Sequence, residues 1–343
     1  MHCMQRTARP ALAWLLAALA LLLGACSHQP LQRVQLTASQ TLLDVPFVAQ
    51  REHYCGPASL SMLLQQRGLA QTQQRIAEAI YLPGRKGTLQ AEIAAYIRAQ
   101  GLLAYQIPPH LQALLDEIAT GNPVLVLQNL GFVRWPRWHY AVAIGYDLDR
   151  QQLILHSGQH ARYRLDLRTF VRTWQRAGHW GLVALPSQQP ALSPSADADS
   201  LLAAIIELET HSGQRVPIST YQRIAQHAPT NSLAWFSLGN RLYSLASPAS
   251  RLSALGHFLR AAELEPNPGY YNNLAWVASE LGCAALAASA LQCGLAQEPG
   301  NRFLRDTQNN PPTPLALDKP VPCPSLHCPA AIPATAADSD QVR

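Results

Sequence analysis

The sequence predicts an α+β domain followed by an all-α domain, and three observations support this division. Between residues 41 and 187 helical patterns come first and strand patterns follow, an order typical of an α+β unit. Residues 188–200 are rich in Pro, Ser, Ala and Asp, which is typical of a linker. Residues 201–308 show only helical periodicity. A chain of 343 residues has room for two such domains.

The composition is that of a chain with a real hydrophobic core. Hydrophobic residues make up 48% of the sequence and charged residues 14%. The formal net charge of +5 is modest, and no run of basic residues is present. We therefore expect no nucleic-acid partner.

Residues 1–25 have the three parts of an export signal. Arg6 and Arg9 precede an apolar run at 11–23, and small residues follow. The run is too short for a comfortable transmembrane helix. Removing this segment lowers the formal charge from +5 to +3, because Arg6 and Arg9 are lost.

The end of this segment, LGAC at residues 23–26, resembles the lipobox of bacterial lipoproteins. The resemblance implies cleavage before Cys26 and acylation of that cysteine, which would anchor the chain to the membrane. Ser27 is similar to the residue found in lipoproteins sorted to the outer membrane, so we expect an outer-membrane or periplasm-facing location in the cell envelope. An ordinary secretory leader or a retained N-terminal anchor are the alternatives. Residues 26–40 are predicted to be a tether.

Local patterns then predict the elements of the domain at residues 41–187. Thr88 is the expected cap of one helix, and Gly68 and Gly101 are the expected stops of two. Helices are predicted at 56–66, 72–80, 88–99, 111–119 and 167–176, and strands at 42–48, 102–107, 123–127, 139–146, 152–157, 163–165 and 181–185.

Three residue types with complementary chemistry occur in this domain. Cys55 precedes a Gly-Pro pair that begins a helix, and the positive end of that helix is expected to lower the pKa of the thiol. Gln50 lies five residues upstream and His139 begins a predicted strand. A thiol nucleophile needs an imidazole base and an oxyanion donor, and these residues supply all three. A buried, inert cysteine is the alternative.

These residues, with YCGPASL at 54–60 and HYAVAIGYD at 139–147, resemble the bacteriocin-processing, double-glycine leader cysteine peptidases. The resemblance is closer to their stand-alone exported relatives fused to tetratricopeptide repeats. It implies a papain-like fold over residues 42–185, with Cys55 as nucleophile, His139 as general base and Gln50 as oxyanion donor. The mechanism needs no cofactor, and none is expected.

The chain departs from this family at the third catalytic position, where an Asp commonly orients the His. Folding the hairpin at 147–150 brings residues 156–158 opposite His139, and none of them is a carboxylate. His156 is predicted to be the orienting residue, with Ser157 and Gln159 as alternatives. Orientation can also be absent, which would favour a degenerate peptide-binding module.

Two other interpretations of these residues were considered. A zinc site formed by His53, Cys55, His139 and His156 has no recognised spacing, so no metal is expected. Trp135 and Trp138 either line a substrate cleft or cap the core.

The helical part contains two segments that resemble tetratricopeptide repeats. The matching residues are Trp235, Leu238, Gly239, Ala254, Phe258, Ala261 and Pro266 in one segment, and Leu274, Ala275, Ala287, Leu291, Gly294 and Pro299 in the next. A degenerate copy is expected at 198–230, and an unrelated helical bundle is the alternative. Such repeats imply a surface for a protein partner or a substrate.

The tail at 309–343 is rich in Pro and Ala and is predicted to be disordered. Cys323 and Cys328 lie close enough in this tail to pair with each other in an oxidising compartment. Cys283 and Cys293 are too far apart on one helix to be bridged, and small apolar packing is the preferred interpretation of both.

Taken together, the sequence predicts an exported, lipid-anchored cysteine peptidase with a peptide or protein substrate. The alternative function is a catalytically degenerate peptide-binding or scaffold lipoprotein.

Overall fold

The structure is a computed structural model that describes residues 34–317 and 319–328. The signal segment, Cys26 and most of the predicted tether lie outside the described residues, so those assignments stay predictions. Within the described part of the chain, no helix is long and apolar enough to span a bilayer.

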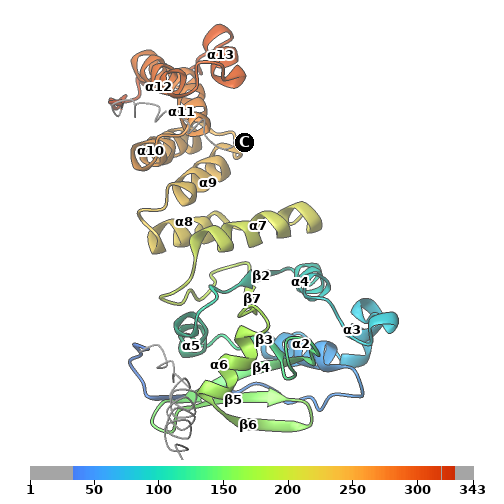
Figure 1. The fold of residues 1–343 in the computed structure, drawn as a ribbon. Coiled ribbons are helices and arrows are strands. Elements are labelled where there is room, and N and C mark those ends of the chain that lie inside the picture. The colour runs from blue at the N-terminus through green and yellow to red at the C-terminus, as the bar shows by residue number, and fades with distance from the viewer. Residues whose placement is uncertain (1–33, 318, 329–343) are drawn as a thin grey trace, which may run out of the picture. The chain divides into compact units, whose positions relative to one another are not determined.

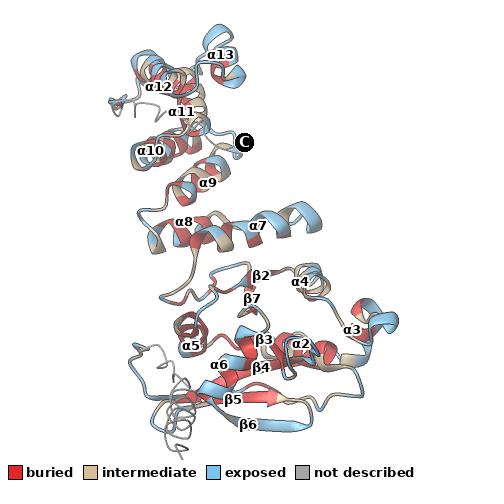
Figure 2. Cartoon of the chain, in the orientation of Figure 1, coloured by how far each residue is buried: buried red, intermediate tan, exposed pale blue. Residues whose placement is uncertain are grey.

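A seven-stranded antiparallel sheet forms the centre of the first part of the chain (Figure 1). Its order is β2-β7-β3-β4-β5-β6, with β1 pairing to β4 as well. The strands are β1 (Gln40–Leu42), β2 (Leu102–Gln106), β3 (Val124–Asn129), β4 (Trp138–Asp147), β5 (Gln152–Ser157), β6 (His160–Asp166) and β7 (Gly181–Pro186). β3 and most of β4 are buried, whereas the edge strand β6 is exposed (Figure 2).

Five α-helices and one short 3-10 helix accompany the sheet. They are α2 (Cys55–Gln66), α3 (Gln73–Ile80), η1 (Pro83–Arg85), α4 (Gln90–Ala99), α5 (Leu111–Ala119) and α6 (Leu167–Gln175). Local caps explain three of the starts, because Thr72, His110 and Asp166 each accept a hydrogen bond from a backbone N–H in the first turn. The predicted cap at Thr88 is wrong, since α4 begins one residue later, after Leu89.

Helix α2 packs on the sheet through a shared apolar core. Leu60, Leu63 and Leu64 of α2 are fully buried in one cluster with Val142 and Ile144 of β4. Burying a leucine side chain contributes about 1.5 to 3 kcal/mol, so these contacts fix α2 firmly against β4. This packing fixes the position of Cys55, the first residue of α2, relative to the first residues of β4.

The predicted strand at 42–48 is wrong over most of its length. Only Gln40–Leu42 forms β1, and the following segment runs on without strand pairing. Leu43 still donates its N–H to the Ile144 carbonyl at 2.8 Å. Pro46 cannot donate a backbone hydrogen bond, which explains why the ladder does not continue.

The predicted linker at 188–200 is in fact packed structure. Ser193 is fully buried and its hydroxyl donates to the Glu117 carboxylate of α5 at 2.6 Å. The first helix of the C-terminal part already begins at Ala198. The Ser- and Pro-rich composition of this segment therefore reflects local turns and caps.

Seven helices follow, which agrees with the predicted all-α part. They are α7 (Ala198–Ser212), α8 (Ile218–His227), α9 (Ser232–Tyr243), α10 (Pro248–Leu264), α11 (Pro268–Glu280), α12 (Ala284–Gln297) and α13 (Arg302–Asn309). A Cβ on Gly239 of α9 would lie 2.7 Å from the Phe258 ring of α10, so glycine permits this close helix contact. The tetratricopeptide character of these helices stays a prediction.

The predicted disorder of the tail does not hold for residues up to 328. Cys323 forms a disulfide with Cys283, and Cys328 forms one with Cys293. Leu326, between the two bridges, is buried. Cys323 and Cys328, which the sequence placed close enough to pair, do not pair with each other, and the predicted apolar packing of Cys283 and Cys293 is wrong, because the tail folds back onto α11 and α12.

Candidate active site

Cys55 is the first residue of α2, one residue before the predicted start of that helix, and the pKa of its thiol also differs from the prediction. Its thiol is the only free one among the described residues and is partly buried. Burial raises the pKa of the Cys55 thiol above its ordinary value, and hydrogen bonds from the backbone N–H groups of Tyr140 and Gly56 lower it by a smaller amount. The expectation of a lowered pKa is wrong, because desolvation outweighs the helix N-terminus.

The thiol also lies near β4, because Cys55 and Tyr140 line the same cavity. The Tyr140 N–H, which favours the thiolate, belongs to the peptide bond that joins His139 to Tyr140. The start of α2 and the segment of β4 that carries His139 are therefore brought together, although 84 residues separate Cys55 from His139 in the chain, and His139 itself is not among the described residues that line this cavity.

His139 is held from the neighbouring strand by a hydroxyl group. Its Nε2 atom lies 2.9 Å from Oγ of Ser157, the last residue of β5. Burial lowers the pKa of the His139 imidazole, and the positive charge of Arg137 lowers it further. Because Nε2 is engaged by Ser157, Nδ1 is the ring atom left to exchange a proton with a thiol.

His156, the predicted orienting residue, is not brought to His139. Its Nε2 lies 2.9 Å from the Val45 carbonyl oxygen, and its Nδ1 accepts a hydrogen bond from the Arg162 N–H at 3.1 Å. Both ring nitrogens are thus used to fasten the segment at 45–47 and the start of β6. Successive side chains of a strand point to opposite faces, so only one of His156 and Ser157 can face His139.

Gln50 lies beside the turn that follows Ser157. Its backbone N–H donates to the Gly158 carbonyl at 3.1 Å, and its own carbonyl accepts from the Gln159 side-chain amide. The structure therefore brings Gln50 to the β5–β6 turn. Gln159, one of the predicted alternative partners of His139, instead donates a hydrogen bond to Gln50.

A cavity of about 600 Å³ opens beside Cys55. Tyr140 and Trp138 of β4 form one wall, and the basic loop with Arg85 and Lys86 forms another. The Tyr140 hydroxyl donates to the Thr88 carbonyl at 3.2 Å, which joins the two walls. Trp138 therefore lines the cleft, one of the two roles considered for it.

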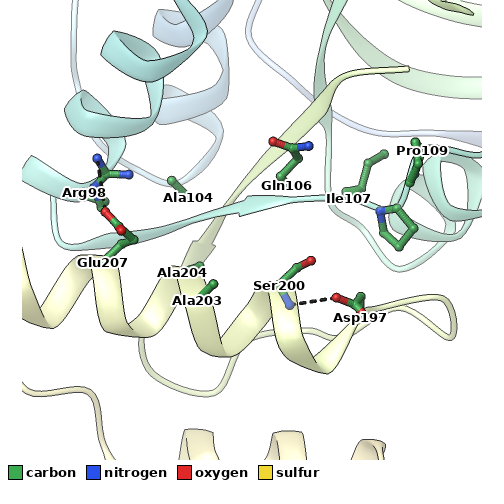
Figure 3. Close-up of a pocket in the computed structure, with 11 residues that line it drawn as sticks. Arg98, Ala104, Gln106, Ile107, Pro109, Asp197, Ser200, Ala203, Ala204 and Glu207 are labelled. Atoms are coloured by element: carbon green, nitrogen blue, oxygen red, sulfur yellow. Dashed lines mark hydrogen bonds and ion pairs between the residues drawn. The ribbon is translucent and has the colours of Figure 1, made fainter. Parts of the chain in front are cut away.

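A second cavity, of about 560 Å³, lies between α4, β2 and α7 (Figure 3). Arg98 and Glu207 point toward each other across one end of it, with 3.9 Å between their charged atoms. Its described lining residues include no Cys or His, so the thiol chemistry belongs to the cavity beside Cys55.

The zinc alternative finds no geometric support in the part of the chain that the structure describes. There, no group of three or more His, Cys, Asp or Glu side chains gathers closely enough to hold a metal ion. Both ring nitrogens of His156 form hydrogen bonds with backbone groups, so neither has a free lone pair for a metal.

Comparisons with known proteins address the fold around this site. A C39-like peptidase from Bacillus anthracis has 16% sequence identity and a TM-score of 0.36, covering 43% of this chain and 97% of that one. A double glycine motif protease from an AMS/PCAT transporter, solved with the leader peptide, has 18% identity and a TM-score of 0.34, covering 45% and 99%. No curated protein matches the chain. Residues 42–181, which include Gln50, Cys55, His139 and Ser157, match the model of the Peptidase_C39 like family.

Proposed function

We propose that the protein is a cysteine peptidase that hydrolyses peptide bonds through Cys55 and His139, with the helical part binding the substrate or a partner protein. The observation that carries this proposal is that Cys55, at the start of α2, lines one cavity with Trp138 and Tyr140, the two residues that flank His139 on β4. The match of residues 42–181 to a peptidase family supports a peptide as the substrate.

The directions of the two pKa shifts define the resting state of this site. The thiol pKa lies above 9.0 and the imidazole pKa below 6.5, so both groups are neutral near pH 7. His139 then acts as a general base, taking the thiol proton at Nδ1 while the sulfur bonds to the scissile carbonyl carbon. The proton passes to the leaving amine as the C–N bond breaks. Water then hydrolyses the thioester and releases the acid.

Charge develops on the carbonyl oxygen during both steps and needs hydrogen-bond donors. The Gln50 side-chain amide and the Cys55 backbone N–H are proposed for this role, in keeping with the family resemblance. Fastening of Gln50 to Gly158 and Gln159 supports it, since a donor must be held in place before the reaction. Ser157 is a positioning residue, because it acts on His139 and not on the substrate.

Alkylation of Cys55 by iodoacetamide tests the proposed chemistry. Produced from Ser27 onward, the protein carries one free thiol among its described residues. We expect a labelling rate that still rises above pH 9, because the thiol pKa is raised from 9.0. His139→Ala should slow labelling at pH 7.5 by on the order of 100-fold, the size of a typical general-base contribution.

The matched control for this experiment is His160→Ala, which removes an exposed imidazole from the edge strand β6. Equal labelling rates in the wild type and the His139 variant would contradict the role of His139 as base. A rate that reaches its plateau below pH 8 would contradict the neutral resting state.

The second candidate function is a catalytically degenerate peptide-binding or scaffold protein. It is favoured by the partner of His139, which is a neutral hydroxyl and so stabilises an imidazolium less than a carboxylate does. Under this function, a peptide should bind in the cavity beside Cys55 with no turnover. Cleavage of a peptide that depends on Cys55 would rule it out.

We also propose that the mature protein is a lipoprotein of the bacterial cell envelope, anchored through Cys26. The LGAC pattern at residues 23–26 and the preceding apolar run support this location. Mass spectrometry of the mature N-terminus should find an acylated Cys26. A free N-terminus produced by cleavage elsewhere would contradict the proposal.

A further inference from the structure

The loop joining β3 to β4 exposes an unusual amount of apolar surface. We call residues 130–138 the aromatic loop. Five of its nine residues have large, apolar and exposed side chains, which on an ordinary water-facing loop would be unfavourable. The exposed fractions are 45% for Leu130, 74% for Phe132, 81% for Val133, 73% for Trp135 and 55% for Trp138.

The base of the aromatic loop is built so that these side chains stay outside. The buried Asn129 accepts hydrogen bonds at its Oδ1 from the N–H groups of Gly131 and Arg137, at 3.0 and 2.9 Å. The Leu130 N–H donates to the Arg137 carbonyl at 2.9 Å, and the Phe132 N–H donates to the Trp135 carbonyl at 3.2 Å. The exposure is therefore a property of an ordered turn.

Gly131 shows how closely this turn is packed. A Cβ at that position would collide with the Trp135 carbonyl oxygen, so only glycine fits there. Two special residues, Asn129 and Gly131, thus hold the tip in a conformation that presents Phe132, Val133 and Trp135 to the outside.

The charges of the aromatic loop are all of one sign. Arg134 and Arg137 alternate with the apolar residues, and the loop contains no Asp or Glu. Aromatic side chains that enter the interface, flanked by cations that meet lipid phosphates, are the combination by which peripheral proteins bind anionic bilayers. Tryptophan in particular favours the headgroup region.

A peptide substrate is the competing occupant of this surface, and the cavity beside Cys55 argues against it. Among the described residues, Trp138 at the base of the loop lines that cavity, whereas Phe132, Val133 and Trp135 at the tip do not. The tip therefore presents its apolar side chains outside the cleft that a substrate would fill.

We propose that the tip of the aromatic loop inserts into the interface of an anionic phospholipid membrane. Phe132, Val133 and Trp135 enter the headgroup and acyl boundary, and Arg134 and Arg137 contact phosphate groups. Phe132, Val133, Arg134 and Trp135 have no role in the proposed reaction, and Arg137 bears on it only through its effect on the pKa of His139.

Co-sedimentation with vesicles tests the proposal. The described residues from Leu36 onward form one compact unit, so the protein can be produced from Ser27 onward, without the apolar leader or Cys26. We expect binding to vesicles of phosphatidylethanolamine with phosphatidylglycerol, and weaker binding to phosphatidylcholine or at high salt. The double variant F132S/V133S should bind about tenfold more weakly, and R134Q/R137Q should lose most of the preference for anionic lipid.

Phe303→Ser is the matched control, because Phe303 is 58% exposed, lies beside Arg302 and belongs to α13. It should leave vesicle binding unchanged. No binding by the wild type, or an equal loss in F303S and F132S/V133S, would overturn the proposal. Normal vesicle binding by F132S/V133S, together with a raised KM for a peptide, would also overturn the proposal. It would show that the tip of the loop binds the peptide substrate. Repeating the assay with Cys55→Ala separates this result from the fate of the proposed peptidase activity.

Discussion

The pKa of the Cys55 thiol is set by burial, by the start of α2 and by the Tyr140 N–H, and burial has the largest effect. The helix start and the Tyr140 N–H favour the thiolate, while the surrounding core disfavours any charge. His139 experiences the corresponding effect, since burial and Arg137 both disfavour the imidazolium. Each pKa unit amounts to about 1.4 kcal/mol, so even modest shifts in these directions keep the pair neutral. The resting site is expected to need a substrate before proton transfer occurs.

Ser157 offers a direct way to alter this balance. Ser157→Asp places a carboxylate where the hydroxyl now meets Nε2 of His139, and an opposite charge favours the imidazolium. The imidazole pKa should rise by about one unit or more. Because activity is lost when the base is protonated, the acid limb of the pH profile of kcat/KM should move to higher pH.

Ser157→Ala is the companion variant, because it removes the hydrogen bond without adding charge. It should lower kcat and leave the acid limb near its original position, which lies below 6.5 because the pKa of His139 is lowered from that value. An acid limb at the same pH in Ser157→Asp and the wild type would show that Ser157 does not position the base.

At the scale of elements, two features join parts of the chain that look independent in sequence. The segment after β7 is fastened to α5 through Ser193 and Glu117, and Asn122 donates to the same carboxylate at 2.7 Å. Burial raises the pKa of Glu117, although these two donors lower it in part. The tail is fastened by two disulfides, to Cys283 just before α12 and to Cys293 within α12. These contacts hold the segment after β7 and the tail against the neighbouring helices.

The two disulfides should stabilise the helical part and leave the site unaffected. They close loops with sequence separations of 40 and 35, and a loop of this size is worth about 3 to 4 kcal/mol in the chain-entropy view. The double variant C323S/C328S should therefore unfold at lower temperature, as followed by circular dichroism. The two loops overlap, so their contributions should add only in part.

Iodoacetamide labelling of Cys55 provides the control, because its rate should be the same in C323S/C328S and the wild type. Identical melting curves with and without reductant would contradict the stabilising role. Alkylation of four additional cysteines in the unreduced protein would show that the bridges are absent.

Local patterns were enough to predict elements whose signals lie within the element itself. The helix at 111–119 and the strand at 152–157 are found at the predicted residues, because apolar periodicity and flanking breakers specify them. Features that depend on distant partners were missed. Cys283 and Cys293 were interpreted from their separation on one helix, and nothing local indicates that the tail returns to them.

The candidate site was predicted to a similar extent. Gln50, Cys55 and His139 carry a recognisable order in sequence, and the structure places Cys55 in one cavity with the two residues that flank His139. Choosing between His156 and Ser157 required the register, which shifts by one residue between Ala143 and Gly145. The raised thiol pKa was also beyond local reasoning, since it depends on how deeply the core surrounds α2.

At the scale of the whole molecule, the proposed peptidase site, the proposed membrane contact and the two disulfides lie on different segments of the described chain. The proposed nucleophile Cys55 begins α2, the proposed base His139 belongs to β4, and the aromatic loop leads directly into β4 through Trp138. A membrane contact at the tip of that loop would bring the cavity beside Cys55 close to the bilayer. Peptides that are themselves bound at the membrane surface are then the expected substrates.

The central claim is that Cys55 is the nucleophile of a working peptidase, and peptide cleavage tests it most directly. The protein produced from Ser27 onward is incubated with a proteome-derived peptide library, and new termini are identified by mass spectrometry beside the Cys55→Ala variant. We predict new termini with the wild type that are absent with Cys55→Ala. The account would be contradicted by the same set of termini with both proteins, or by no cleavage with a wild type whose Cys55 is free and reactive toward iodoacetamide.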